Sequence, residues 1–166
     1  MISHLFSRSL SVRNATSGDC TFVREMISKI NKIVYGSDVV PKNFNEVYNQ
    51  MIQNPKKFPI FVAEEKDEKN KTVPLGAIVT STMLYIQTCK PSLYIQDLVV
   101  DESARGKGVG SVLINHVIDY CKNNEMNYID LVQPPDSDKF HEKRTKFYTE
   151  QGFEIGGRYR LMNLKP

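Results

Sequence analysis

The sequence predicts an α/β (α+β) fold in which a mixed sheet carries helices on both of its faces. Segments with strand-like alternation and segments with helical spacing follow one another in the order β–α–α–β–β–β–α–β–α–β. The composition, 40% hydrophobic and 25% charged, is that of an ordinary globular protein and excludes disordered, collagen-like and coiled-coil classes. At 166 residues we expect one domain spanning residues 1–166.

The first half of the chain is predicted to hold one strand, two helices and then a hairpin. Thr16 to Asp19 supply N-cap chemistry for the first helix, whose apolar residues recur at helical spacing until Gly36 ends it. A charged, solvated loop over residues 65–71 joins the two strands of the hairpin. The predicted elements are a strand over 9–15, helices over 20–35 and from about Asn43 to before Pro55, and strands over 59–64 and 75–85.

The next strand, residues 93–100, has a polar interruption at its centre. Apolar residues occupy both odd- and even-numbered positions of this strand, which predicts that both of its faces are buried. Gln96 and Asp97 interrupt the pattern, and buried polar side chains cost free energy unless they are satisfied. The pair therefore indicates a bulge or a site where a ligand meets the sheet; the alternative is a strand end that simply reaches solvent.

A glycine-rich loop follows this strand and precedes a helix. Gly106, Gly108 and Gly110 stand beside Arg105 and Lys107, a combination that predicts an anion site built from backbone N–H groups and a helix N-terminus. A P-loop is excluded because no Gly-Lys pair is followed by Ser or Thr, and the glycine spacing does not fit a dinucleotide fingerprint. Glycines needed only for a tight turn would leave the two basic residues unexplained.

The last part of the chain is predicted to add two helices and two or three strands. Pro134-Pro135 forces a turn, and Ser137 or Asp138 can cap the final helix. Gly152 stands where that helix ends. The predicted elements are a helix over 109–121, a strand over 128–132, a helix over 140–150 and one or two closing strands over 153–164.

Charge and cysteine content narrow the classes of function. A net charge of +3 is too small to indicate nucleic-acid binding. Cys20, Cys89 and Cys121 are widely spaced and form no CxxC pair, so we expect reduced thiols, a cytoplasmic location and no zinc site. The three histidines lie far apart without an HExxH motif, so no metal is expected.

Membrane association is not expected either. The longest mostly apolar stretch, residues 75–86, is interrupted by hydroxyl side chains and is too short for a membrane span. The first 18 residues hold Arg8, Arg13 and several serines with no acid, which faintly suggests a mitochondrial presequence. The same region also fits a first strand running into a capped helix, and we favour that interpretation.

Three segments together resemble the GNAT superfamily of acetyl-CoA-dependent N-acetyltransferases. The strand Ile95-Gln-Asp-Leu-Val-Val-Asp101, with Arg105, Gly108 and Gly110 after it, resembles the first family signature. Phe147-Tyr-Thr-Glu-Gln-Gly-Phe153 resembles the second. The resemblance spans nearly the whole chain and implies a mostly antiparallel central sheet of about six or seven strands, flanked by about four helices.

The resemblance also implies a cosubstrate, acetyl-CoA. Backbone groups of Leu98, Val99 and Val100 would pair with the pantetheine arm and polarise the thioester carbonyl. The backbone of the loop would hold the pyrophosphate, with the side chains of Arg105 and Lys107 adding positive charge. The loop residues assigned to this role are Arg105, Gly106, Lys107, Gly108, Val109 and Gly110.

Two residues are assigned to proton transfer. Tyr148 would protonate the departing thiolate, which is chemically reasonable because the pKa values of a phenol, ~10, and of a thiol, about 8–9, are close. The alternative for Tyr148 is aromatic packing against Phe147 and Phe153. Asp97 is the preferred general base for the attacking amine, with Gln96 orienting the acceptor; a solvated Asp97 without a catalytic role is the alternative.

Two positions depart from the family pattern. Members often carry Asn seven residues before the tyrosine and Ala four before it, whereas this chain has His141 and Arg144. His141 either replaces the asparagine in binding the pantetheine or that contact is lost. Arg144 either reaches a coenzyme phosphate or lies on the surface.

These observations predict an N-acetyltransferase that moves an acetyl group from acetyl-CoA to a primary amine by direct attack in a ternary complex. The expected acceptor is a small-molecule amine, an amino sugar or an amino acid. The alternatives are a non-catalytic acyl-CoA-binding sensor or scaffold, and an enzyme that acetylates protein N-termini or lysines. Tyr35, Phe44 and Tyr48 either line the acceptor entrance or pack in the core. Strand pairing between two chains of the family allows a homodimer.

Overall fold

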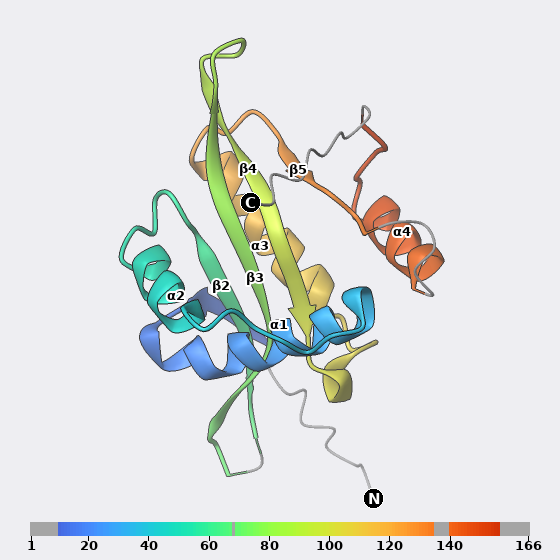
Figure 1. Cartoon of the computed structure of the whole chain (residues 1–166). Helices are drawn as coiled ribbons and strands as arrows, with labels where there is room; N and C mark the ends of the chain where they lie inside the picture. The colour runs from blue at the N-terminus through green and yellow to red at the C-terminus, as the bar shows by residue number, and fades with distance from the viewer. Residues whose placement is uncertain (1–9, 68, 135–139, 157–166) are drawn as a thin grey trace, which may run out of the picture. The chain divides into compact units, whose positions relative to one another are not determined.

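The computed structural model describes residues 10–67, 69–134 and 140–156. These residues form two compact units that divide after Leu131. The first unit contains the sheet and three α-helices, with the long hairpin of β3 and β4 running through its middle (Figure 1). The second unit contains helix α4, His141–Glu150. The expectation of one domain over residues 1–166 stays a prediction.

Five strands form one sheet in the order β1-β2-β3-β4-β5. The first four pair antiparallel in sequence order, and β5 pairs parallel to β4. The predicted mixed, mostly antiparallel sheet is therefore confirmed. The strands are β1 (Ser11–Asn14), β2 (Ile60–Lys66), β3 (Thr72–Tyr85), β4 (Lys90–Val100) and β5 (Ile129–Leu131).

Helices form where the apolar spacing predicted them. Helix α1 ends at Gly36, whose left-handed φ of 70° suits a residue without Cβ. A turn of 3-10 helix, η1 (Ser17–Asp19), leads into α1, and a second, η2 (Glu102–Ala104), follows β4. The α-helices of this unit are α1 (Cys20–Tyr35), α2 (Phe44–Ile52) and α3 (Val109–Asn123).

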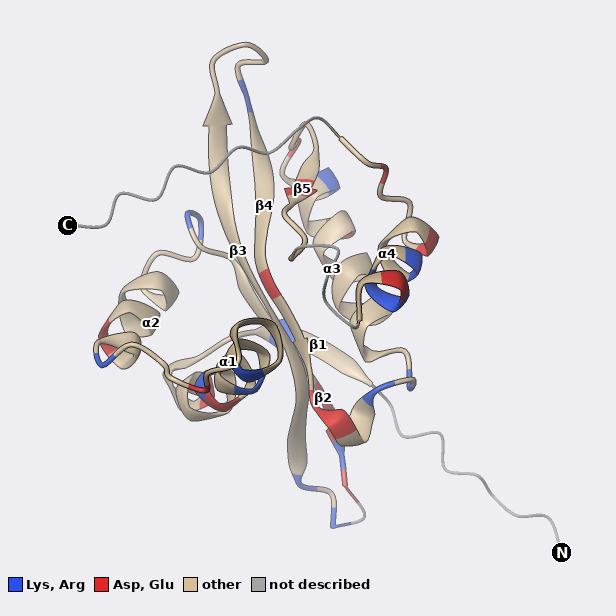
Figure 2. Cartoon of the chain, turned by 45° about the vertical axis from the view of Figure 1, so that its right-hand side comes forward, with Lys and Arg blue, Asp and Glu red and all other residues tan. Residues whose placement is uncertain are grey.

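The helices cover opposite faces of the sheet (Figure 2). On one face, side chains of α1 and α2 form a core with β2, β3 and β4 that includes Val23, Tyr48, Val79 and Val99. On the other face, α3 packs against β2 to β4, and the ring of Phe61 meets that of His116 edge-on at 4.5 Å. We refer to these as the α1/α2 face and the α3 face.

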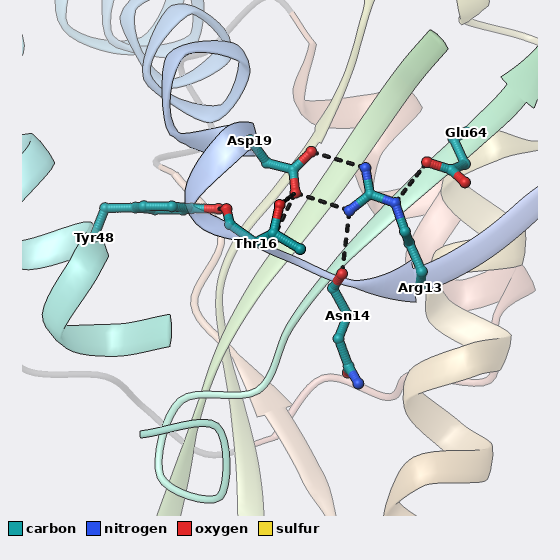
Figure 3. A network of polar contacts seen from close by, with 6 residues as sticks. All are labelled: Arg13, Asn14, Thr16, Asp19, Tyr48 and Glu64. Atoms are coloured by element: carbon teal, nitrogen blue, oxygen red, sulfur yellow. Dashed lines mark hydrogen bonds and ion pairs between the residues drawn. The ribbon is translucent and has the colours of Figure 1, made fainter. Parts of the chain in front are cut away.

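A partly buried ion pair connects the first strand to the start of the first helix (Figure 3). The Arg13 guanidinium donates two hydrogen bonds to the Asp19 carboxylate, at 2.8 and 2.9 Å, and a third to Glu64 at 2.6 Å. Asp19 also accepts from the amide and hydroxyl of Thr16, which completes the predicted cap. Burial raises the pKa of Asp19, but the hydrogen bonds from Arg13 and Thr16 outweigh it and hold that pKa below its usual value.

A β-bulge at Gln96 exchanges the faces of the sheet to which the odd- and even-numbered side chains of β4 point. Val79 of β3 pairs with Asp97 and Thr80 pairs with Ile95, so Gln96 is the extra residue. Before the bulge odd-numbered side chains share the α3 face, and after it even-numbered ones do. The apolar residues at both odd and even positions therefore come from this one exchange of faces. Of the interpretations of Gln96 and Asp97, the register shows the bulge.

Some expected elements fall outside the described residues. The proposed caps Ser137 and Asp138 lie there, as does most of the expected closing strand region, from residue 157 onward. The described part of that region, residues 153–156, is not in a strand. The sheet therefore has five strands among the described residues, compared with the six or seven expected.

Candidate functional site

The second half of β4 has an open edge next to β5. β5 pairs with β4 only from Leu93 to Ile95, where the Leu93 amide donates to the Tyr128 carbonyl at 3.0 Å. Within the residues that the structure describes, no strand pairs with this edge beyond Ile95. The strand thus continues past its neighbour and leaves backbone groups available to a ligand.

Hydrogen-bond alternation identifies which backbone groups face that open edge. The Asp101 amide donates to the Leu75 carbonyl of β3 at 2.8 Å. Because successive residues of an antiparallel strand alternate between its two edges, Val99 also bonds toward β3. The N–H and C=O groups of Leu98 and Val100 then point to the open edge, so two of the three predicted pantetheine contacts lie there.

The glycine-rich loop forms the N-terminal end of α3. Gly106 and Gly108 have φ values of 77° and 81°, which favour glycine, and Gly108 is the N-cap. The first intrahelical hydrogen bond runs from the Val112 amide to the Gly108 carbonyl, so the preceding amides have no partner inside the helix. Such a row of free amides at a helix N-terminus fits an anion, and a pyrophosphate has the required charge.

Both basic side chains of the loop are exposed. Arg105 lies 3.7 Å from the Glu102 carboxylate, with nearly half of its side chain accessible to solvent. An exposed pair of this kind is weak, so the guanidinium can turn to another anion at little cost. Lys107 is exposed as well.

Gly76 of β3 holds the loop close to β4, and sequence reasoning missed it. A Cβ at Gly76 would lie 2.8 Å from the Val99 carbonyl oxygen and 3.0 Å from the Val109 side chain. The absence of a side chain therefore lets the first turn of α3 pack directly on the sheet. An isolated glycine inside an apolar strand was the available signal, since it often marks a close backbone approach.

Asp97 stands directly after the bulge, on the α1/α2 face. Its side chain is half-buried, and burial raises the pKa of its carboxyl group. Among the described residues no hydrogen bond or ion pair engages this carboxylate. A partly desolvated carboxylate without a partner has the properties of a general base. Gln96 beside it is exposed.

In the second unit, Tyr148 lies on α4 and packs between two aromatic rings. It is 9% exposed, and its ring meets those of Phe147 and Phe153 edge-on at 5.2 and 5.5 Å. This packing fixes the ring, as the alternative interpretation expected, and is compatible with a role for the hydroxyl. His141 and Arg144 are both half-buried on the same helix, so Arg144 is not a fully exposed surface residue.

The aromatic residues considered for the acceptor entrance belong mainly to the core. Tyr48 is 4% exposed, and its hydroxyl donates to the Thr16 carbonyl at 2.9 Å. Phe44 stacks on Tyr48, with ring centroids 6.3 Å apart. Tyr35 is exposed at the end of α1. The core interpretation therefore holds for Phe44 and Tyr48.

Two negative observations apply to the described part of the chain. None of its helices is both long and apolar enough to cross a membrane. No three side chains of the His, Cys, Asp and Glu types come together there in a way that could hold a metal ion.

Solved structures of several known proteins share this fold. An acetyltransferase from Trypanosoma brucei has a TM-score of 0.70 and 19% identity, covering 94% of this chain and 100% of its own. An aminoglycoside acetyltransferase from an uncultured soil metagenomic sample, solved with trehalose, has a TM-score of 0.70 and 21% identity over 94% and 97%. A transcriptional regulator from Bacillus halodurans has a TM-score of 0.74 and 20% identity over 94% and 100%.

The sequence was compared with curated proteins and with family models. No curated protein matches the sequence significantly. The model of the Acetyltransferase (GNAT) family matches residues 24–153, which is well over half of the chain and includes the open strand, the glycine-rich loop and Tyr148. The chain therefore belongs to the GNAT acetyltransferase family, whose cosubstrate is acetyl-CoA, and is an acyltransferase.

Proposed function

We propose that this chain transfers the acetyl group of acetyl-CoA to a primary amine of a small molecule by direct attack in a ternary complex. The observation that carries the proposal is the run from β4 into α3. There, an open strand edge leads into a loop whose glycine amides, followed by the first amides of α3, make no backbone hydrogen bond among the described residues and can bind an anion. One continuous backbone segment can in this way hold both the pantetheine arm and the pyrophosphate of one molecule.

Binding of the cosubstrate is assigned to backbone groups first and side chains second. Leu98 and Val100 would pair with the pantetheine arm through the open edge, with Val99 keeping β4 attached to β3. The amides of Gly106, Gly108, Val109 and Gly110 would surround the pyrophosphate, since the Lys107 amide donates to the Ala104 carbonyl at 3.3 Å. Arg105 and Lys107 would add charge, and His141 would contribute to the pantetheine contacts.

The chemical step needs a proton acceptor, a polarised carbonyl and a proton donor. The amine nitrogen forms the new C–N bond while the C–S bond of the thioester breaks. The amine proton passes to Asp97, whose raised pKa makes it a better base than an exposed aspartate. The Leu98 amide would donate to the carbonyl oxygen as negative charge develops there. Tyr148 would return a proton to the thiolate.

A small-molecule acceptor is favoured by the neighbours of the same fold. The soil metagenomic protein is an aminoglycoside acetyltransferase, and it has also been solved with sisomicin, at a TM-score of 0.70 and 20% identity. An aminoglycoside is a small molecule that carries amines. We extend the class of acceptor, and not the particular compound, to this chain.

Release of the free thiol of CoA over a panel of amines tests the proposal. The panel contains an amino sugar, amino acids, aliphatic amines, an aminoglycoside and a lysine-containing peptide. We expect thiol release with at least one small amine above the rate of hydrolysis without an acceptor. Acetyl-CoA that raises the melting temperature without thiol release for any amine would indicate a binding module instead. Release with the peptide alone would indicate a protein substrate.

A further inference from the structure

The outer part of the α1/α2 face carries a group of tyrosines and an aspartate that the proposed reaction does not use. Tyr85 ends β3, Tyr128 precedes β5 and Asp130 lies within β5. The rings of Tyr85 and Tyr128 have centroids 5.4 Å apart and are tilted by 45°. The Tyr85 hydroxyl donates to the Asp130 carboxylate at 3.4 Å. We call these three residues the tyrosine–aspartate strip.

The register places this strip on the same face as Asp97. Asp130 pairs with Tyr94, which in turn pairs with Ser81 of β3. Ser81 has the same parity as Val79, the partner of Asp97, and Val79 packs in the core below α1 and α2. The two carboxylates therefore share one face, on neighbouring strands at the point where β4 and β5 part.

Their separation suits the two ends of one small molecule. Asp97 lies beyond Tyr94 by three residues, one of which is the bulge, so it is displaced along the strand by about two residue steps. With ~3.3 Å per step and ~4.8 Å between strands, the two backbone positions are roughly 8 Å apart. A short aliphatic chain can span that distance.

The strip has the chemistry that binds an ammonium group. Tyr128 is 40% exposed and presents an aromatic face, and the Asp130 carboxylate is half-buried beside it. Aromatic faces and carboxylates both attract cations, more so where water is partly excluded. The nearest cation in the register, Lys90, is exposed at the hairpin end and makes no ion pair with Asp130 among the described residues.

A buried hydroxyl on the same face also lacks a hydrogen-bond partner among the described residues. Ser92 is 0% exposed, and its hydroxyl has no hydrogen-bond partner within the described residues. The register turns Ser92 to the α1/α2 face beside Tyr128, because Leu93 pairs with Ile129. A buried hydroxyl without a partner costs free energy, and because it can both donate and accept, an ammonium group placed beside it is one of the groups that would satisfy it.

We propose that the tyrosine–aspartate strip binds a second ammonium group of the acceptor, so that the acceptor is a diamine or oligoamine. Its other amine, in the neutral form, meets Asp97 and is acetylated. This inference rests on the proposed function and narrows its acceptor to one chemical class. A monoamine of equal length lacks the group that the strip holds.

A matched pair of acceptors tests the proposal in the intact protein. Cadaverine and pentylamine have the same carbon chain and differ in the second amine. We expect kcat/KM for cadaverine to exceed that for pentylamine at least about tenfold, mainly through KM. Asp130→Asn should remove most of this preference, and Tyr128→Leu part of it, without changing the affinity for acetyl-CoA. Asp119→Asn, which neutralises an exposed acid on α3, is the matched control.

A binding measurement separates this inference from the proposed function. Cadaverine should raise the melting temperature of the parent more than pentylamine does, and Asp130→Asn should abolish the difference. Equal effects of the two amines on turnover and on melting temperature would contradict the proposed role of the strip. A preference for cadaverine that is retained in Asp130→Asn would contradict it as well. Acetylation of amino sugars or monoamines alone would do the same while leaving the proposed function intact. Absence of thiol release with every amine would contradict the proposed function. The shifts in melting temperature would still show whether the strip binds a second ammonium group.

Discussion

Gly76 of β3 faces the Val99 carbonyl of β4 so closely that an added Cβ would lie 2.8 Å from its oxygen. The same Cβ would come within 3.0 Å of Val109, in the first turn of α3. The position of the glycine-rich loop therefore depends on the absence of a side chain at Gly76. This absence lets the sheet contact the first turn of α3 directly, and the loop leads into that turn.

Gly76→Ala should lower both stability and cosubstrate binding. The methyl group must displace either the β4 backbone or the first turn of α3, which we expect to lower the free energy of unfolding by about 1–3 kcal/mol. The rise in melting temperature with acetyl-CoA should shrink as well. Gly18→Ala is the control, because its Cβ would meet nothing closer than 3.5 Å. Parent-like stability in Gly76→Ala would show that α3 moves freely on the sheet.

Gly108→Ala tests the loop itself. Gly108 has a φ of 81° and open space around its Cβ position, so the protein should fold with the modest cost of a left-handed alanine, about 1 kcal/mol. We expect the affinity for acetyl-CoA, measured by calorimetry, to fall at least about tenfold because the backbone can no longer approach the phosphates. Gly36→Ala imposes the same strain at a φ of 70° and should bind normally. Equal affinities in the two variants would place the pyrophosphate elsewhere.

Asp97→Asn should reduce turnover without reducing stability at neutral pH. Burial raises the pKa of Asp97 in the folded state, so folding is disfavoured as pH rises through that pKa and the carboxyl becomes charged. The neutral amide avoids this cost. Turnover should fall by on the order of 10²-fold if the carboxylate is the base. The stability difference between variant and parent should shrink in acid, where both side chains are neutral; thermal unfolding over a pH series measures it. A loss of stability at pH 7 would contradict this reasoning.

The pH profile of the parent follows from the same group. Because only the ionised carboxylate accepts a proton, activity should decline as pH falls through the raised pKa of Asp97, above the usual aspartate range. The affinity for acetyl-CoA should stay constant over that interval. An acidic limb that persists in Asp97→Asn would identify a different base.

Tyr148→Phe separates proton donation from packing. The ring and its two aromatic contacts remain, so stability and acetyl-CoA affinity should be close to those of the parent. Turnover should fall by on the order of 10²-fold, and less with a cosubstrate analogue whose thiol is more acidic. Tyr48→Phe is the matched control: it loses the hydrogen bond to Thr16, so its free energy of unfolding should fall by about 1 kcal/mol with turnover unchanged. Full turnover in Tyr148→Phe would remove the general-acid assignment.

Much of the first unit could be predicted because its signals are local. The apolar spacing of α1, the stop at Gly36 and the glycine-rich start of α3 each act within one or two turns of chain. The polar pair Gln96-Asp97 also indicated an irregularity in β4, with a bulge as one interpretation, since unsatisfied polar groups in a buried strand demand a structural reason.

Features that depend on strand register could not be predicted in this way. The contact of Gly76 with Val99 requires knowing which residues of β3 and β4 are opposite one another. The meeting of Tyr85 with Asp130 requires, in addition, the parallel pairing of β5 across β4. Nothing local in the sequence identifies the partner in either contact, because the two residues are 23 and 45 positions apart.

The bulge at Gln96 makes the length of β4 a determinant of its chemistry. Side chains on a strand alternate strictly, so one extra residue exchanges the two faces for everything that follows. Loss of a single residue at this point would leave the hydrophobic content of the strand unchanged. It would nevertheless turn Asp97 to the α3 face, or Leu93 and Ile95 to the α1/α2 face. Insertions and deletions, usually harmless in loops, are therefore more disruptive here than most substitutions. In this segment the spacing of the residues matters more than their identity.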